Sequence, residues 1–236
     1  PSLYKRFVLN SWDDDICVNN VFNPEDIDKA VKKYLVPKPF VKNIISCDPA
    51  SMGDDETVSY NFIDGRIADS DIYEKKHPME TVGRLIVFKN RTGANLIGLD
   101  CIGIGEGIDY RLMELKQPVL PIDYRRKSTI ERAYKNMRAE IYDYGSEMFR
   151  NGETSIPDDD ILIEELKTIL WKDGSDGRQV ESKDEIKKRI QRSQNRADAC
   201  VNGLWTLKYA EPIYMNQFTG ILHRQPAEIY YRKCSY

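Results

Sequence analysis

The chain has 236 residues, of which 41% are hydrophobic and 31% charged, and its formal net charge is −3. This composition predicts one large soluble domain, or one domain with appendages, and excludes a disordered polymer. The acidic balance disfavours a generally basic nucleic-acid coat but allows a local basic groove. Five cysteines without a C-x-x-C pair indicate neither a disulfide framework nor a zinc knuckle. Without a signal peptide or an apolar run of roughly 18 residues, we expect no secretion and no membrane contact.

The first predicted strands follow one another closely. Residues 41–48 form a continuous apolar run that ends in Asp48 and predicts a central strand covered on both faces. Two β-rich runs over 57–74 flank the dipeptide Asp64-Gly65, which tolerates the positive φ of a type I′ turn. These runs predict a hairpin, and the middle one of the three strands is then antiparallel.

Helices and buried strands alternate in the next part of the chain. A helical pattern covers about 78–90, and a second apolar run over 94–100 ends in Asp100. A short helix over 107–115 and a strand over 118–123 follow. Strands that alternate with helices in this way are typical of an α/β sheet.

The second half of the chain is mainly helical. Ser128 and Glu131 have the spacing of a capping box and predict a helix of about five turns. Residues 158–171 predict another helix, and Ser182 and Glu185 form a second capping box before a basic helix.

The last predicted helix covers 195–207. Asn195 is its expected N-cap, and Asp198 lies in its first turn. No internal repeat or low-complexity segment is present.

Carboxylates at the ends of two buried strands point to a functional site. In open α/β sheets, functional groups gather beyond the carboxyl ends of the strands, where Asp48 and Asp100 lie. A single strand-end Asp is usually a turn or cap residue, but two carboxylates that are brought together repel each other and favour a cation. Asp198 is the third candidate ligand, and Asp54 and Asp55 are weaker ones. Oxygen ligands alone favour Mg²⁺ or Mn²⁺.

Other chemistries have less support in the sequence. The two histidines, His77 and His223, lie in no pattern of nucleophile and base. The glycines of "GIGEG" suggest a dinucleotide site with Asp123, but the spacing is not G-x-G-x-x-G, and Asp100 would repel a pyrophosphate.

A set of basic residues flanks the predicted site elements. Such residues often form a solvated face, but Lys and Arg also neutralise phosphates. The candidates for DNA contact are Arg125, Arg126, Lys127, Lys187, Lys188, Arg189, Arg192 and Arg196.

Four stretches in this order carry a family resemblance: "IISCDPASMGDDETV", "IGLDCIGIGEGIDYRL", "NMRAEIYDYG" and "VESKDEIKKRIQRSQNRADACVNGLW". Together they resemble the nuclease domain of the large terminase subunit of tailed bacteriophages. The resemblance implies an RNase H-like α/β fold with a mixed five-stranded sheet, second strand antiparallel, flanked by helices. It implies a metal-dependent endonuclease that cuts concatemeric double-stranded viral DNA during genome packaging.

The resemblance also implies a domain division and partners. Residues 1–40 are expected to be an extension or linker from a missing ATPase motor domain, 41–210 the nuclease domain and 211–236 a C-terminal tail. The portal protein and the small terminase subunit are the implied partners, in the host cytoplasm rather than in the virion.

The matching motifs assign Asp48, Asp100 and Asp198 as catalytic metal ligands. Our hypothesis is that Asp48 bridges two Mg²⁺ or Mn²⁺ ions and that Asp100 and Asp198 each hold one.

Three alternatives remain open at this point. A junction resolvase or transposase-type nuclease shares the fold and the acids. A non-catalytic module that docks on the portal or small terminase subunit could use the tyrosine-rich tail. An actin-like ATPase also has Asp-ended strands, although the chain is short for its two lobes.

Overall fold

The computed structural model describes residues 19–51, 53, 55–130, 133–172, 174, 177–215 and 222–223. Their central feature is a five-stranded sheet of order β4-β3-β2-β5-β6. Its strands are β2 (Asn43–Asp48), β3 (Thr57–Ile63), β4 (Arg66–Tyr73), β5 (Leu96–Asp100) and β6 (Val119–Ile122).

The sheet is mixed, as predicted. β3 runs antiparallel to β2 and β4, whereas β2, β5 and β6 are parallel. Asp64 lies in the turn between β3 and β4 and has a φ of 51°. This is the positive φ that the Asp-Gly dipeptide tolerates. The structure therefore confirms the α/β class and the antiparallel second strand.

The helices are α2 (Pro24–Ala30), α3 (Pro78–Thr92), α4 (Ile104–Glu114), α5 (Met137–Arg150), α6 (Asp160–Thr168), α7 (Lys183–Ile190) and α8 (Asn195–Thr206). Two small sheets accompany them. One consists of β1 (Phe40–Val41), β9 (Ile213–Met215) and β10 (Leu222–His223), and the other of β7 (Trp171–Lys172) and β8 (Gln179–Val180). In the described residues, no helix combines the length and the apolar character needed to cross a bilayer.

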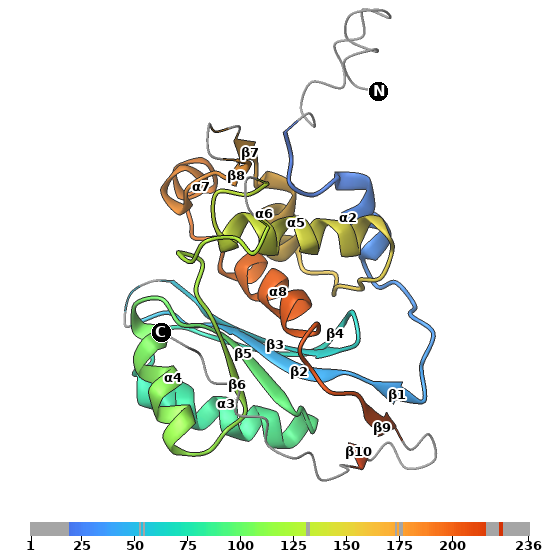
Figure 1. Cartoon of the computed structure of the whole chain (residues 1–236), viewed down its shortest axis with the longest axis vertical. Coiled ribbons are helices and arrows are strands. Elements are labelled where there is room, and N and C mark those ends of the chain that lie inside the picture. Colours follow the sequence, from blue (N-terminus) through green and yellow to red (C-terminus); the bar gives the residue numbers. More distant parts are fainter. Residues whose placement is uncertain are drawn as a thin grey trace, which may run out of the picture.

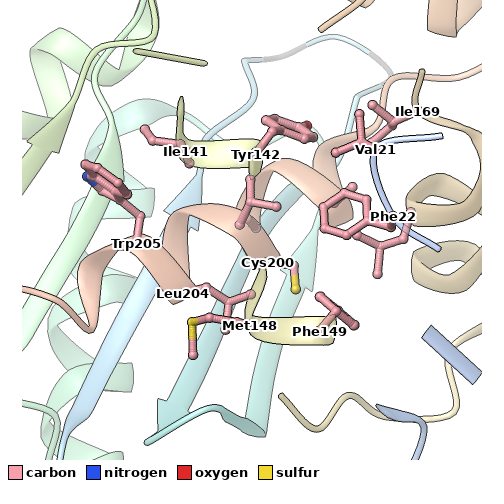
Figure 2. Packing of buried hydrophobic residues seen from close by; sticks show 14 of the residues in the cluster. Val21, Phe22, Ile141, Tyr142, Met148, Phe149, Ile169, Cys200, Leu204 and Trp205 are labelled. Carbon is pink, nitrogen blue, oxygen red and sulfur yellow. The ribbon is translucent and has the colours of Figure 1, made fainter. Parts of the chain in front are cut away.

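Helices cover both faces of the large sheet (Figure 1). α3 and α4 pack on one face, where Ile45 and Cys47 of β2 point. α8 lies on the other face, with α5 and α6 outside it, and Ile44 belongs to this larger core. Figure 2 shows Leu204 of α8 in this core, together with residues of α5 and the N-terminal segment. Side chains of β2 point alternately to the two faces of the sheet, so the strand contributes residues to two separate hydrophobic cores.

Glycines allow α8 to lie very close to the sheet. A Cβ atom on Gly98 of β5 would lie 1.9 Å from Oγ1 of Thr206, and one on Gly203 would lie 2.1 Å from the ring of Phe62. Any larger residue at either position would push the helix and the sheet apart. These contacts set the distance between α8 and the sheet, and with it the position of the first turn of α8.

Parts of the predicted extensions contribute to the fold. Phe22 and Ile27 are completely buried in the larger core, because α2 packs on α5 and α6. β9 pairs with β1. Residues 1–18, 216–221 and 224–236 lie outside the described residues.

The long helix of the second half begins later than predicted. α5 starts at Met137, and the side chain of Asn136 caps it by accepting from the Ala139 amide at 3.1 Å. Ser128 does not cap a helix: its hydroxyl accepts from the Ile130 amide at 3.0 Å and donates to the carboxylate of Glu140 at 2.8 Å. Glu131 lies outside the described residues. The described residues 128–130 and 133–136 of the predicted first turns are therefore not helical, and Glu140 accepts from Ser128 and Thr129 in this segment.

The start of α8 also differs from the prediction. Gln194 occupies the N-cap position and makes no capping bond with its side chain. Instead, Glu165 of α6 accepts from the Ala197 amide at 2.8 Å, and Asn195 donates to the Glu56 carbonyl at 2.9 Å. The cap of α8 thus comes from a neighbouring helix. The Ser182 capping box before α7, in contrast, is formed as predicted.

Glu165→Gln is expected to change how stability depends on pH. Burial raises the pKa of Glu165 from 4.5 to about 8, against the opposing effects of the Ala197 hydrogen bond and the Arg192 charge. The folded chain thus keeps a proton that the unfolded chain releases. The stabilising contribution of this proton is full below about pH 4.5 and is lost progressively towards about pH 8.

Urea unfolding measures this effect. The free energy of unfolding of the unmodified chain, minus that of Glu165→Gln, should fall as the pH rises from about 5 to 8. A difference that does not change with pH would contradict the expectation.

Candidate functional site

Two strands of the sheet end in neighbouring carboxylates. β2 and β5 are parallel, with Cys47 opposite Leu99, so Asp48 and Asp100 follow next to each other. Because Cys47 and Leu99 belong to the core under α3 and α4, both carboxylates point to the opposite face, towards α8. Their exposed fractions are 5% and 4%.

α8 adds a third carboxylate. Asp198 lies in its first turn and is completely buried, because α8 packs on β2, β3 and β5. Burial raises the pKa of Asp48 well above its ordinary value; the charge of Lys183 opposes this rise, and those of Asp198 and Asp100 add to it. Burial also raises the pKa of Asp100, and the charge of Lys183 opposes this rise. The structure therefore brings the three predicted acids together.

Lys183, the first residue of α7, supplies the positive charge of this cluster. Its Nζ lies 2.8 Å from Oδ2 of Asp198. Burial alone would lower the pKa of Lys183, but the charges of Asp198, Asp48 and Asp100 raise it above its ordinary value. Burial likewise works to raise the pKa of Asp198, and the charges of Lys183 and Arg138 hold it below its ordinary value. When all three carboxyl groups are ionised, the charges of Lys183 and Arg138 leave one negative charge for a cation to neutralise.

The donor set suits a hard divalent cation. Carboxylate oxygens with an excess of negative charge are the ligands that Mg²⁺, Mn²⁺ and Ca²⁺ prefer. Asp198 is nevertheless held by another partner, because one of its oxygens forms the ion pair with Lys183. In line with this, no group of three or more His, Cys, Asp or Glu side chains in the described part of the chain is arranged around a metal position.

Two tyrosines contact the other oxygen of Asp198. The Tyr142 hydroxyl donates to Oδ1 at 2.5 Å. Tyr124, two residues after the end of β6, has its hydroxyl 3.5 Å from the same oxygen and 2.8 Å from Oδ1 of Asn202. Buried Arg138 precedes Tyr142 by one turn of α5, with its guanidinium carbon 5.1 Å from the ring centre. These partners favour the ionised form of Asp198.

Five of the eight predicted DNA-contact residues form ion pairs within the protein. The pairs are Arg125 with Asp123, Lys187 with Asp55, Arg189 with Glu181, Arg192 with Glu164 and Glu165, and Arg196 with Glu56 and Asp159. Over the described ranges, Arg126, Lys127 and Lys188 take part in no ion pair. These last three side chains have the charge most available for phosphates.

The loop after Asp48 is tied to α7 and to the segment before α8. Oδ1 of Asp55 lies 3.3 Å from Nζ of Lys187 and accepts from the Ser193 hydroxyl at 2.8 Å. Asp54 lies outside the described residues. A metal-binding role for Asp55 stays a prediction.

Sequence reasoning missed Lys183, Tyr124 and Tyr142 as site residues. Lys183 follows the N-cap Ser182, so the sequence assigns it only to the start of a helix. Tyr142 lies 56 positions from Asp198 and fits an ordinary core position of α5. One usable signal was that Tyr124 lies two residues after the end of a third strand, at the same edge of the sheet as the acids.

The chain was compared with known proteins at the level of sequence and of structure. No protein-family model matches it, and no curated protein matches it in sequence. The nuclease domain of the large terminase subunit gp2 of bacterial virus Sf6 has a similar structure, with a TM-score of 0.68 and 18% identity over 78% of this chain and 98% of that one. The large terminase nuclease from thermophilic phage G20c with bound magnesium matches with a TM-score of 0.61 and 15% identity, over 80% and 97% of the two chains.

A mutant of the Sf6 domain with manganese gives a TM-score of 0.66 and 16% identity, over 78% and 98% of the two chains. At such identities the similarity establishes the fold. The chain has the RNase H-like fold of these nuclease domains, as the sequence predicted.

Proposed function

We propose that this chain is a metal-dependent endodeoxyribonuclease that cuts concatemeric double-stranded viral DNA during genome packaging. The observation that carries this proposal is the cluster of Asp48, Asp100 and Asp198 in a fold shared with large terminase nucleases. Two of the similar structures contain magnesium or manganese, the ions that the carboxylates here favour.

The three aspartates would hold the ions. By the family resemblance, Asp48 would be the ligand shared by two ions, and Asp100 and Asp198 would each hold one. When bound, the ions would stabilise negative charge on the phosphate and activate water for hydrolysis. The protein's own part is to hold the carboxyl groups buried and close together.

The remaining roles follow from charge. Arg126, Lys127 and Lys188 are assigned to the DNA backbone, which predicts weak sequence preference and strong salt dependence. An ATPase motor, the portal protein and the small terminase subunit are the proposed partners. The proposed nuclease unit of residues 41–210 also includes the segment with α2, because Phe22 and Ile27 are buried in its core.

Plasmid cleavage tests the proposal. Supercoiled plasmid incubated with the chain and Mn²⁺ should be nicked and linearised, and a chelator such as EDTA should stop the reaction. Calorimetry should show Mn²⁺ binding by the same preparation. A chain that binds no Mn²⁺ and cuts no plasmid would contradict the proposal, and tight binding to portal protein would then favour the docking module.

A second comparison separates the two nuclease classes. Linear duplex, a four-way junction and supercoiled plasmid are offered at equal concentration. Similar cleavage of all three is expected for a packaging nuclease, whereas cleavage restricted to the junction would favour a resolvase.

A further inference from the structure

The two oxygens of Asp198 have different surroundings. Oδ2 lies 2.8 Å from the ammonium of Lys183, the same group whose pKa responds to the charges of Asp48 and Asp100. Oδ1 instead faces the inner side of α5, where the Tyr142 hydroxyl donates to it at 2.5 Å. Both Tyr142 and Asp198 are completely buried, so water does not compete for this bond.

We infer that Tyr142 is a positioning residue that directs Oδ2 of Asp198 towards the metal. A carboxylate rotates about its terminal bond, and a short hydrogen bond to one oxygen fixes where the other points. Partners of this kind typically change metal affinity when they are removed, although they do not touch the metal. The inference rests on the proposed function, because it takes Asp198 as a metal ligand.

Tyr142 should have a larger effect than Tyr124. A hydroxyl has one proton to donate. Tyr124 lies 2.8 Å from Oδ1 of Asn202 but 3.5 Å from Asp198, so its proton goes to Asn202. The Tyr142 proton goes to Asp198. Arg138 supports this arrangement, since its buried guanidinium lies near the Tyr142 ring and its Nη1 donates to the Glu181 carbonyl at 2.5 Å.

The test compares three tyrosine-to-phenylalanine substitutions. Tyr142→Phe removes the proposed positioning hydroxyl, and Tyr124→Phe removes the weaker neighbour. Tyr60→Phe is the matched control, because Tyr60 is also buried and its hydroxyl has no hydrogen-bond partner in the part of the chain that the structure describes. Circular dichroism and urea unfolding show that each variant is folded, and calorimetry measures its affinity for Mn²⁺.

Tyr142→Phe should bind Mn²⁺ about tenfold more weakly, with a smaller loss in Tyr124→Phe and none in Tyr60→Phe. Plasmid cleavage by Tyr142→Phe should recover at high Mn²⁺, which a merely structural defect would not show. Equal affinities in Tyr142→Phe and the unmodified chain, or an equal loss in Tyr60→Phe, would overturn the inference alone. Should Tyr142→Phe not fold, Tyr142→Met, which also lacks the hydroxyl, is compared with Tyr60→Met and decides the inference in the same way. Absence of Mn²⁺ binding by the unmodified chain would overturn the proposed function as well.

Discussion

Asp48→Asn, Asp100→Asn and Asp198→Asn are each expected to abolish Mn²⁺-dependent cleavage of plasmid DNA. An amide keeps the shape of the side chain but removes the charge that attracts the cation. Losing several kcal/mol of charge stabilisation lowers the rate roughly a thousandfold. Initial rates of plasmid nicking at fixed Mn²⁺ measure this loss. Asp69→Asn is the control, because this carboxylate lies on the edge strand β4 and pairs with Arg91.

The same substitutions should affect stability in opposite directions. The pKa of Asp48 is raised by burial, so its ionised form destabilises the metal-free fold at neutral pH and Asp48→Asn should stabilise it. The pKa of Asp198 is lowered by Lys183 and Arg138 despite burial, so Asp198→Asn should destabilise it. Urea unfolding without metal measures both. A folded variant that keeps full cleavage activity would remove its residue from the proposed site.

Much of the sheet was predictable because its signals are local. Apolar runs that end in Asp48 and Asp100 mark buried strands, and the Asp64-Gly65 turn fixes the antiparallel neighbour. Once two parallel strands lie side by side, alternation along each strand puts both carboxylates on one face. That Asp48 and Asp100 lie side by side therefore follows from the alternation of side chains along a strand and the parallel direction of β2 and β5 alone.

Contacts between helices were not predictable in the same way. The Asp198 surroundings depend on how closely α8 approaches the sheet, which Gly98 and Gly203 allow. No pattern in the sequence predicts the distance between α8 and the sheet. The late start of α5 also depends on tertiary contacts, since the Glu140 carboxylate accepts from Ser128 and Thr129, and Asn136 supplies the helix cap instead. Tertiary partners override local capping signals in both helices.

Lys183→Met is expected to raise the affinity of the chain for Mn²⁺. The Lys183 ammonium lies 2.8 Å from Oδ2 of Asp198 and interacts electrostatically with Asp48 and Asp100. It therefore competes with a metal ion for the same carboxylates. Removing a like charge from the site favours the cation. A gain of about tenfold, or about 1.4 kcal/mol, is a reasonable expectation for one partly screened charge at this distance.

The metal-free chain should respond in the opposite direction. Without the ammonium, the three carboxyl groups lose their counter-charge, so Lys183→Met should be less stable than the unmodified chain until Mn²⁺ is added. Calorimetry and urea unfolding, each with and without Mn²⁺, measure the two effects. Lys188→Met is the matched control on the same helix, since Lys188 takes part in no ion pair in the described part of the chain. If Lys183→Met and Lys188→Met bound Mn²⁺ alike, the ammonium would not compete with the metal, and Lys183 would serve only to hold α7 against α8.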